Sequence, residues 1–499
     1  MRRIPTLPKT GTGPALLLVF PTAFHANEWW ISCYWSRADP PLSREPSHLK
    51  NATCNPAVNR AYSPQRGGEK SMSDLAIGKR LSGIPKRYLL VSLCFVATFI
   101  CYIDRVNISV AIIPMAEEYG WSGTTKGLVL SSFFIGYMLA MIPTGWLANR
   151  YGGRILLGIA LIGWSVFTFL TPIAAGLSFS ALIVTRILMG IGEAASFPAV
   201  YNLLARWIPE RERSRAAAVN LTGIPLGTIF ALSATGWLIA NYGWPSVFYT
   251  FGALGIVFAL IWLWLVHPRP SAHPTISAAE KAELASLDAD IGTSPEPVPW
   301  KFLFSHSAVW ALVVNHFCAN WTLYLFLTWL PSYFRDVQGL SIAGSGLFAI
   351  GPWISQFICG NLSAHVADKM ISNGADVTRV RKIMQCGGLL GGAGFLLLAS
   401  QAATPNMALF TLCAALGAGS MCWAGFASNH LDIAPKHADV LWSISNTAGT
   451  LPGIIGVTLT GLLLDVTGGY TATFIVAAGI NVVGALIWMI WGTGKRIID

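Results

Sequence analysis

The sequence predicts an all-α integral membrane protein whose twelve transmembrane helices fall into two halves of six. Three observations support this prediction. Of the 499 residues, 54% are hydrophobic and 11% are charged, with a mean hydropathy of +0.55, whereas soluble domains average about 25% charged residues. Twelve apolar stretches are long enough to cross a bilayer as helices. The basic residues are distributed very unevenly among the connecting segments.

The twelve apolar stretches begin at Tyr88. Helices are the expected form because the strands of a membrane barrel would alternate polar and apolar residues. Proline interrupts several stretches, which transmembrane helices tolerate. The expected limits are 88–115, 127–148, 155–176, 180–204, 216–240, 245–267, 308–333, 343–366, 382–401, 406–431, 440–464 and 472–493.

The distribution of the 33 Lys and Arg residues predicts the topology. Nine precede Met72, and twenty lie on the side of the first span that carries the amino terminus. The opposite loops carry only Lys126 and Arg335. Cytoplasmic loops are enriched in basic residues, so both termini are expected in the cytoplasm of a multi-pass protein of the cell inner (plasma) membrane. The net charge of +10 then reflects topology, and no nucleic-acid partner is expected.

Residues 1–71 differ from the rest in being rich in Pro, Arg, Ser and Asn. The apolar piece Ala15–Phe24 follows basic residues as a signal peptide does, but it is too short to span a membrane. A transit peptide, and with it an organelle membrane, is a second interpretation. We favour a third, in which translation starts at Met72 and 1–71 is a non-native or disordered extension. The stretch Gly67–Lys70 requires purine-rich codons, as a bacterial ribosome-binding site would.

The longest polar connection, 268–307, divides the chain into an amino-terminal bundle, 72–267, and a carboxy-terminal bundle, 308–499. Within this cytoplasmic linker, Ser277-Ala-Ala-Glu280 is typical of a capping box that opens a short surface helix toward Ala289.

The two halves share a local pattern. Leu147-Ala-Asn-Arg150 follows the second span, and Val366-Ala-Asp-Lys369 follows the eighth. The same device at the same place in each half indicates an internal duplication. Two repeats around a central binding site are a recurrent design among membrane transporters.

The fourth span carries Arg186 and Glu193 inside an apolar run. Charge at membrane depth is costly, so it usually faces a protein-lined cavity and indicates function. Seven residues are almost two turns, so both side chains share one helix face about 10 Å apart. Small residues such as Gly190 and Gly192 allow close helix approach. The competing interpretation is a structural ion pair that locks two helices.

The first span adds a second charged pair in Tyr102-Ile-Asp104-Arg105-Val-Asn107. Neighbouring residues lie about 100° apart on a helix, so Asp104 and Arg105 should face different neighbours. The membrane core then holds two cations and two carboxylates, which sum to zero. Such a core admits an anion if a carboxylate takes up a proton at the same time, because burial disfavours a charged carboxyl and a nearby guanidinium favours it.

The roles follow from this chemistry. Arginine stays charged and offers a planar fork that fits carboxylate or phosphate, so Arg105 and Arg186 are assigned to the substrate anion. Asp104 and Glu193 are assigned to the proton. Permanent salt bridges are the alternative for each residue. Tyr102 and Asn107, in the same stretch as Asp104 and Arg105, join the substrate-binding candidates.

The seventh span is unusually polar. His316, Asn320 and Tyr324 recur every four residues and therefore share one face. They could donate hydrogen bonds to substrate hydroxyls, or join helices to one another. In the eleventh span, Ser445 and Asn446 are expected to line the cavity from the second half.

The tenth span ends with His430 and Asp432, which we interpret as gate or capping groups. Elsewhere the sequence excludes several classes. Most of the nine cysteines lie inside apolar runs without metal-ligand or CxxC spacing, so neither a metal nor a cofactor is expected. The absence of a P-loop excludes ATP as the energy source, and no nucleophile-and-base motif indicates an enzyme.

The stretch Gly145-Trp-Leu-Ala-Asn-Arg-Tyr-Gly-Gly-Arg154 resembles the signature loop of the major facilitator superfamily. Four further stretches resemble its anion:cation symporter family, which includes bacterial sugar-acid permeases, plant plastid phosphate transporters and animal sialic-acid and vesicular glutamate carriers. They are Tyr102-Ile-Asp-Arg-Val-Asn107, Gly190-Ile-Gly-Glu-Ala-Ala-Ser-Phe-Pro198, Asn315-His-Phe-Cys-Ala-Asn-Trp321, and Asp432-Ile-Ala-Pro with Ser445-Asn-Thr-Ala-Gly-Thr-Leu-Pro-Gly453.

The resemblance, over about residues 85–495, implies the major facilitator fold, with two six-helix bundles and alternating access. It implies proton-coupling roles for Asp104 and Glu193 and substrate roles for Arg105 and Arg186. The expected function is proton-coupled symport of a small organic anion, such as a sugar acid, by a monomer in the bilayer. Phosphate or sodium-coupled anion transport, and a nutrient sensor with this fold, are the alternatives.

The signature loop departs from the family pattern at one position. The expected gating residues are Gly145, Asn149, Arg150, Gly153 and Arg154, with Asp368 in the second half. The family usually has Asp where this chain has Asn149. That Asp braces the closed inner side through charge contacts with neighbouring helices, so Asn149 is expected to shift the conformational balance.

Overall fold

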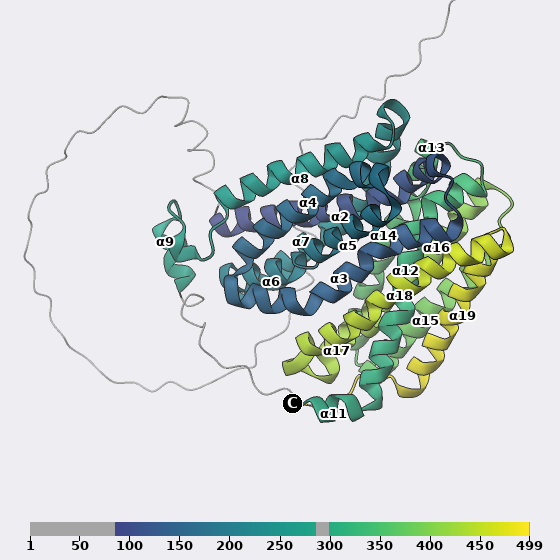
Figure 1. The fold of residues 1–499 in the computed structure, drawn as a ribbon. Helices are drawn as coiled ribbons and strands as arrows, with labels where there is room; N and C mark the ends of the chain where they lie inside the picture. The colour runs from purple at the N-terminus through teal and green to yellow at the C-terminus, as the bar shows by residue number, and fades with distance from the viewer. Residues whose placement is uncertain (1–84, 286–298, 499) are drawn as a thin grey trace, which may run out of the picture. The chain divides into compact units, whose positions relative to one another are not determined.

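The computed structural model describes residues 85–285 and 299–498, and the regular structure in these ranges is helical (Figure 1). Twelve helical segments of the described chain are long and apolar enough to span a membrane, which confirms the predicted fold class. The first six are α2 (Lys86–Tyr119), α3 (Gly123–Tyr151), α4 (Gly153–Leu177), α5 (Phe179–Glu193) with α6 (Ser196–Trp207), α7 (Glu210–Tyr242) and α8 (Pro245–Leu265).

The second six follow two short linker helices, α9 (Ala278–Glu283) and α11 (Trp300–Ser305). They are α12 (Ser307–Asp336), α13 (Ile342–Phe348) with α14 (Ile350–Ser372), α15 (Val377–Ala399), α16 (Pro405–Gly419) with the π-helical turn η2 (Trp423–Ala427) and α17 (Ser428–Ile433), α18 (Ala438–Thr467) and α19 (Thr471–Trp491). Each span begins and ends within a few residues of its predicted limits. The proposed start at Met72 and the extension 1–71 lie outside the described residues.

Local chemistry sets the helix ends. The α2 helix ends because Gly120 adopts a left-handed φ of 66° and its N–H closes onto the Ala116 carbonyl, a conformation that glycine adopts without strain. Only two residues later, the Ser122 hydroxyl accepts a hydrogen bond from the Thr125 N–H and caps α3. The connection between the first two spans is therefore short and fully specified by the sequence.

The α3 and α5 helices pack backbone against backbone. A side chain added at Gly136 would collide with the Ile187 carbonyl, and one added at Gly190 would collide with the Phe133 carbonyl. This close approach, which small residues permit, brings the aromatic face of α3 against the charged face of α5. The fourth span then breaks at Ala194 and Ala195, directly after Glu193.

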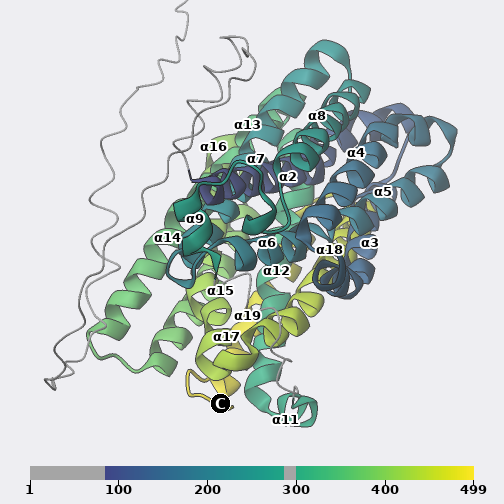
Figure 2. The same ribbon diagram turned by 90° about the vertical axis from the view of Figure 1, so that its left-hand side faces the viewer.

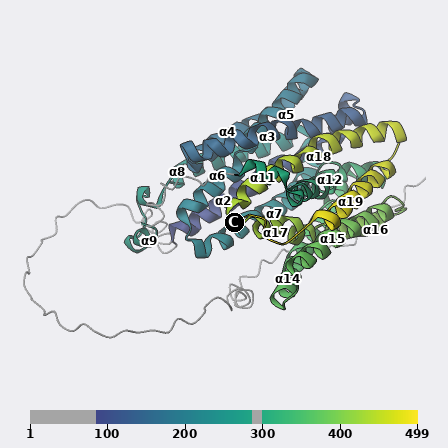
Figure 3. The same cartoon turned by 90° about the horizontal axis from the view of Figure 1, so that it is seen from below.

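The two halves of the described chain run side by side, with α3 next to α18 and α7 next to α13 (Figures 1 and 2). We call the end at which α2 begins and α19 ends the basic end, because Lys86, Arg87, Arg150 and Arg154 lie there. Toward this end the halves diverge, with α6 and α17 well apart (Figure 1), and the view from below shows the two groups of helices beside each other (Figure 3).

At the opposite end the halves are joined by a cluster that we call the outer latch, formed by Gly123, Thr124, Gly461 and Asp465. The Asp465 carboxylate accepts hydrogen bonds from the backbone N–H groups of Gly123 (2.7 Å) and Thr124 (2.8 Å), and from the Thr124 hydroxyl (2.6 Å). An added side chain at Gly461 would collide with the Gly123 carbonyl. A carboxylate of the second half thus caps the first turn of a helix in the first half.

Part of the linker is bound to the first half as a strap, Ser277–Glu283. The Ser277 hydroxyl caps α9 as predicted (3.1 Å). The Glu280 carboxylate, in place of a capping-box bond, accepts the N–H groups of Lys86 and Arg87, both at 2.9 Å. Glu283 pairs with Arg87 at 2.8 Å. The α9 helix ends at Glu283, and residues 286–298, where the predicted helix would continue toward Ala289, lie outside the described residues.

Candidate functional site

Four charged side chains are buried together inside the first half. Asp104 and Arg105 lie on α2, and Arg186 and Glu193 lie on α5. Arg105 is 6% exposed and the other three are at most 1% exposed. Charged groups at this depth require partners or a ligand. The sequence therefore identified four residues that the fold brings into one interior.

Glu193 pairs with Arg105 across two helices. The Arg105 Nε and Nη2 atoms lie 3.0 and 2.8 Å from the same oxygen, Glu193 Oε2. The Cys101 thiol also donates to Oε2, at 3.3 Å. The second carboxylate oxygen, Oε1, is buried and has no hydrogen-bond partner among the described residues. An ion pair between two helices, the competing interpretation of these charges, is thus formed by Glu193 of α5 with Arg105 of α2.

Aromatic rings surround the Arg105 guanidinium. Its central carbon lies 4.9 Å from the Tyr102 ring, 5.1 Å from the Phe133 ring and 4.7 Å from the Tyr137 ring. The Arg186 guanidinium lies 5.5 Å from the same Phe133 ring. Cation–π attraction stabilises both charges in a dry environment. Phe133 therefore separates the two guanidinium groups and positions both.

Arg186 is the less satisfied of the two arginines. Its Nη1 atom lies 3.0 Å from the Met189 sulfur, a weak acceptor, and its Nε has no hydrogen-bond partner in the described part of the chain. Neither Asp104 nor Glu193 forms an ion pair with it among the described residues. A buried guanidinium with unsatisfied donors is suited to bind an anion.

Asp104 faces a different neighbour from Arg105, as the helix geometry predicted. Its Oδ2 accepts a hydrogen bond from the Trp164 indole N–H of α4, at 3.1 Å. Its Oδ1 is buried and has no partner within the described ranges. Asn107, one turn further along α2, is fully buried, and neither its oxygen nor its nitrogen has a partner there. Both residues therefore retain polar capacity inside the first half.

In the second half, the predicted polar face of α12 divides into two parts. His316 and Asn320 bond to α18, through His316 Nδ1 to Ser445 Oγ (3.0 Å) and Asn320 Nδ2 to the Gly449 carbonyl (2.8 Å). These are the helix–helix bonds that the alternative interpretation expected. Tyr324 instead packs against Phe134 of α3, with ring centroids 4.6 Å apart.

Tyr324 is the residue of this face that reaches the first half, through its contact with the Phe134 ring of α3. Asn446 lies close to the first half as well, because its Nδ2 is 4.0 Å from the Met141 sulfur of α3. Ser445 is fully buried and bonds within the second half. Among the site residues predicted in the second half, Tyr324 and Asn446 are thus the two that contact the first half.

The predicted gating residues lie at the basic end. The Asn149 side chain is exposed and accepts a weak hydrogen bond from Asn202 of α6, at 3.4 Å. Asn202 also accepts from the Gly153 N–H at 3.0 Å. Arg150 lies over the Trp146 ring. The remaining members of the motif lie on α3, α4 and α14: Gly145, Arg154, whose Nη2 donates to the Leu263 carbonyl, and Asp368.

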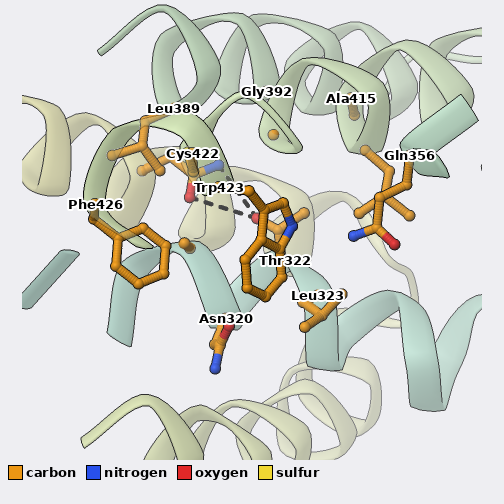
Figure 4. A pocket seen from close by; sticks show the side chains of 14 residues that line it. Asn320, Thr322, Leu323, Gln356, Leu389, Gly392, Ala415, Cys422, Trp423 and Phe426 are labelled. Atoms are coloured by element: carbon orange, nitrogen blue, oxygen red, sulfur yellow. Dashed lines mark hydrogen bonds between the residues drawn. The ribbon is translucent and has the colours of Figure 1, made fainter. Parts of the chain in front are cut away.

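A small cavity with a mostly apolar lining lies inside the second half, bounded by α12, α14, α15, α16, η2 and α19 (Figure 4). Asn320, Thr322, Gln356 and Asn481 supply its polar groups. Thr322 and Asn481 bond to each other at 3.2 Å. Figure 4 shows the Trp423 and Leu323 side chains between Thr322 and Gln356. Of the residues that line this cavity, Asn320 was the one singled out as a candidate site residue from the sequence.

Several residues that contact the charged cluster were not identified from the sequence: Cys101, Phe133, Tyr137, Trp164 and Met189. Aromatic residues are common in membrane spans, so position alone did not separate Phe133 or Tyr137 from lipid-facing rings. A signal existed for Trp164, because a buried indole N–H usually has a hydrogen-bond partner. Phe133 and Tyr137 recur four residues apart and share a helix face.

Twelve spans in two halves, with two arginines buried inside the first half, are typical of a membrane transporter of anions rather than an enzyme. The family model for the Major Facilitator Superfamily matches residues 94–438. The chain belongs to this superfamily and, within it, to the anion:cation symporter family, of which its relatives are members.

Three relatives illustrate the likeness. "Probable anion transporter 4, chloroplastic" from Oryza sativa subsp. japonica is 42% identical over 418 residues, which cover 83% of this chain and 70% of that protein. "Ascorbate transporter, chloroplastic" from Arabidopsis thaliana is 42% identical over 419 residues, 83% of this chain and 76% of that protein. Sialin from Homo sapiens is 35% identical over 443 residues, 82% and 90% of the two chains.

Solved structures show the same fold at low sequence identity. A bacterial homologue of the human lysosomal transporter Spinster matches with a TM-score of 0.66 and 17% identity, covering 82% of this chain and 97% of that one. A xylose transporter from E. coli matches with a TM-score of 0.64 and 15% identity, covering 81% and 96%. The protein is therefore a multi-pass secondary anion transporter with the major facilitator fold.

Proposed function

We propose that this protein is a proton-coupled symporter of a small organic anion, such as a sugar acid. The observation that supports this most directly is that the two buried arginines differ in their partners. Arg105 is neutralised by Glu193, whereas the Arg186 Nε has no hydrogen-bond partner and Arg186 forms no ion pair among the described residues. An arriving anion can thus bind Arg186 directly. It can bind Arg105 only by displacing Glu193 from it.

The coupling step follows from charge balance. A substrate carboxylate first engages Arg186 and then competes for Arg105. As Arg105 turns to the substrate, Glu193 loses the donors at Oε2, and a buried carboxylate without its cation favours the protonated form. The anion and the proton taken up by Glu193 enter together, so the charges of this cluster again sum to zero. Asp104, held by Trp164, is the second proton acceptor that we propose.

The second half supplies the remaining contacts to the substrate. Tyr324 and Asn446, beside the first half, are placed to bond its polar groups, and His316 and Asn320 have further donor or acceptor capacity for hydroxyls. Tyr102 and Asn107 would contact the substrate from α2. A sugar acid combines one carboxylate with several hydroxyls, which matches arginines on one side and amides and phenols on the other.

Relatives keep a second candidate open. "Sodium-dependent phosphate transport protein 1, chloroplastic" from Arabidopsis thaliana is 43% identical over 418 residues, covering 83% of this chain and 81% of that protein. Its name specifies a different anion and a different cation. The ascorbate transporter named above carries an organic anion. Phosphate with sodium is therefore the alternative that the transport experiment must separate from proton-coupled uptake.

For localisation, we propose the cell inner membrane, with the basic end in the cytoplasm and a monomer as the working unit. The chloroplastic names of several relatives support an organelle membrane as the alternative. Expression of the full chain with a fluorescent reporter in its native cell distinguishes the two, since an organelle signal would overturn the inner-membrane assignment.

The test of transport uses purified protein in liposomes with an imposed pH or sodium gradient, and labelled gluconate, benzoate and phosphate as probes. We expect gluconate to accumulate with the pH gradient. Glu193→Gln should still exchange gluconate across the membrane but should not concentrate it, because glutamine cannot carry the proton. The matched control is Glu117→Gln, whose side chain is 60% exposed at the opposite end and pairs only with Arg335.

The outcomes separate the candidates. Accumulation that follows sodium, or phosphate as the sole transported probe, overturns the proposed substrate and coupling ion and favours the phosphate alternative. Binding of a probe with no exchange at all would favour a sensor. If Glu193→Gln concentrates gluconate as well as the unmodified protein does, Glu193 is not the coupling residue.

A further inference from the structure

Two histidines of the second half are joined through a single serine hydroxyl. His316 lies on α12, His430 on α17 and Ser445 on α18. Ser445 Oγ is 3.0 Å from His316 Nδ1 and 2.8 Å from His430 Nε2. All three side chains are at most 2% exposed. The chain of contacts therefore links three elements that are far apart in the sequence.

The hydrogen-bond partners fix the direction of the protons. His430 Nδ1 lies 3.0 Å from the Ala427 carbonyl, which only accepts, so Nδ1 carries a hydrogen. In the neutral ring Nε2 is then an acceptor, and the Ser445 hydroxyl donates to it. The Ser445 oxygen in turn accepts from His316 Nδ1–H. The alternative acceptor for the hydroxyl is the Trp442 carbonyl, at 3.1 Å.

We propose that His316, Ser445 and His430 form a proton-transfer site in the second half, separate from the carboxylates of the first half. This inference rests on the proposed proton coupling. When a proton binds His316 Nε2, the Nδ1 proton passes to the Ser445 oxygen and the Ser445 hydroxyl proton passes to His430 Nε2. His316 is left neutral with its hydrogen on Nε2, Ser445 is again a hydroxyl, and His430 carries the positive charge.

The location suits transfer along the second half toward the basic end. His316 is nine residues into α12 from that end, a rise of about 14 Å. It precedes Asn320 by one turn and Tyr324 by two, and of these three residues Tyr324 contacts the first half. His430 is three residues from the end of α17 at Ile433. A proton that moves from His316 to His430 therefore moves away from the substrate side.

The surroundings can stabilise a charged imidazole without neutralising it. The Trp442 ring lies 5.3 Å from His316 and 5.0 Å from His430, and Phe426 lies 4.8 Å from His316. Aromatic faces attract cations. These rings contact both histidines, so either can hold the charge during transfer.

The charged groups on the surrounding elements are otherwise engaged. The described charged side chains are Arg379, Arg381 and Lys382 on α15 and Asp432 on α17. Arg381 and Asp432 pair with each other at 2.6 Å, Lys382 donates to the Met489 carbonyl at 2.7 Å, and Arg379 is exposed. Arg381 also donates to the Ala424 carbonyl. His437 lies on the neighbouring turn Pro435–His437 (η3) and is 7% exposed. Among the described side chains, no carboxylate forms an ion pair with either histidine of the proton-transfer site.

A purely structural role predicts that any residue able to bridge α12 and α18 would serve. A transfer role instead requires a hydroxyl that can accept and donate in the same step. Ser445→Thr retains the hydroxyl and Ser445→Ala removes it, so the two variants separate the roles. Close packing adds a constraint, because a side chain at Gly449 would lie 2.5 Å from the His316 ring.

The experiment measures protons carried per anion, from the accumulation of gluconate, and in parallel of inorganic phosphate, at a series of pH gradients in liposomes. We expect Ser445→Ala to reduce the number by one while anion exchange at zero gradient persists, and Ser445→Thr to restore it. The serine control is Ser420→Ala, because Ser420 is buried and bonds only its own helix. The histidine control is His365→Gln, at an exposed position on α14.

An unchanged number of protons in Ser445→Ala overturns the proton-transfer site while leaving the proposed symport intact. If the unmodified protein carries no protons with the anion, the proposed function is overturned, and the proton-transfer site with it. Where Ser445→Ala does not fold, as judged by size-exclusion chromatography, His430→Gln replaces it, since glutamine can bond the neighbours but cannot take up the second proton. That variant should also lose one proton per anion, and an unchanged number overturns the site.

Discussion

At the scale of single residues, Arg186 carries the most specific prediction. Its guanidinium lies against Phe133, and its Nε has no hydrogen-bond partner among the described residues. Arg186→Lys keeps the charge but replaces a planar fork by a point charge. Loss of one charge-assisted hydrogen bond costs about 1.5–3 kcal/mol, so KM should rise about ten- to hundredfold.

The measurement is initial uptake against substrate concentration in liposomes. Arg335→Lys is the control, because Arg335 is 37% exposed at the opposite end and pairs with Glu117. A KM for Arg186→Lys equal to that of the unmodified protein would show that Arg186 does not bind the anion.

The sequence identified the charged residues but not their pairing. Charge inside an apolar run is visible without a structure, so Asp104, Arg105, Arg186 and Glu193 could be selected. Which arginine neutralises Glu193 depends on how α2 and α5 pack, and the spacing within each helix does not specify that contact. The contributions of Phe133 and Trp164 likewise depend on contacts between helices that no local pattern specifies.

At the scale of elements, the contact between α3 and α5 determines where the charged cluster forms. Gly190→Ala would place a methyl group against the Phe133 carbonyl and 2.9 Å from the Tyr137 N–H. Backbone cannot move as readily as a side-chain tip, and overpacking costs about 1–3 kcal/mol. We expect a lower Tm and a higher KM, because Phe133 and Tyr137 would move away from Arg105.

Thermal unfolding in detergent and the uptake assay check this expectation together. Gly163→Ala on α4 is the matched control, since nothing lies within 4 Å of an added Cβ there. Equal Tm and KM for the two glycine variants would contradict the proposed role of the close approach.

The spans were predictable as elements because length and hydropathy determine them almost alone. Their internal breaks were not. The fourth span stops at Glu193 and resumes at Ser196, and the tenth contains the π-helical turn Trp423–Ala427. Hydropathy continues through both breaks, so only the packing of neighbouring helices reveals them. The strap shows the converse, because its cap was predictable and its partner, the start of α2, was not.

At the scale of the whole molecule, the outer latch is expected to set the balance between the two access states. The Asp465 carboxylate receives three hydrogen bonds from α3, across the boundary between the halves. Asp465→Asn removes the charge that favours this helix end and replaces one acceptor by a donor. The end of the molecule that the outer latch closes should therefore open more often. If the substitution removes about 1.4 kcal/mol of stabilisation from the closed state, the ratio of open to closed molecules rises about tenfold.

The measurement is the rate at which a reagent added on the outer-latch side labels a single cysteine placed at Ser131. Ser131 bonds Thr458 of the other half at 2.9 Å, so labelling should become faster when this end opens. Asp376→Asn is the control, because Asp376 caps α15 within its own half. Labelling that does not increase in Asp465→Asn relative to this control would show that the latch does not hold the closed end.

The strap has a practical consequence for taking the molecule apart. Glu280 and Glu283 follow the sixth span in the chain, yet they complete the first turn of the first span. Anyone who wishes to express the two halves as separate polypeptides and let them reassemble should therefore cut the gene after Glu283, not at Pro268 where the polar linker begins. A cut at Pro268 would place Glu280 in the carboxy-terminal fragment. The backbone N–H groups of Lys86 and Arg87, in the amino-terminal fragment, would then lose their acceptor and be left to water.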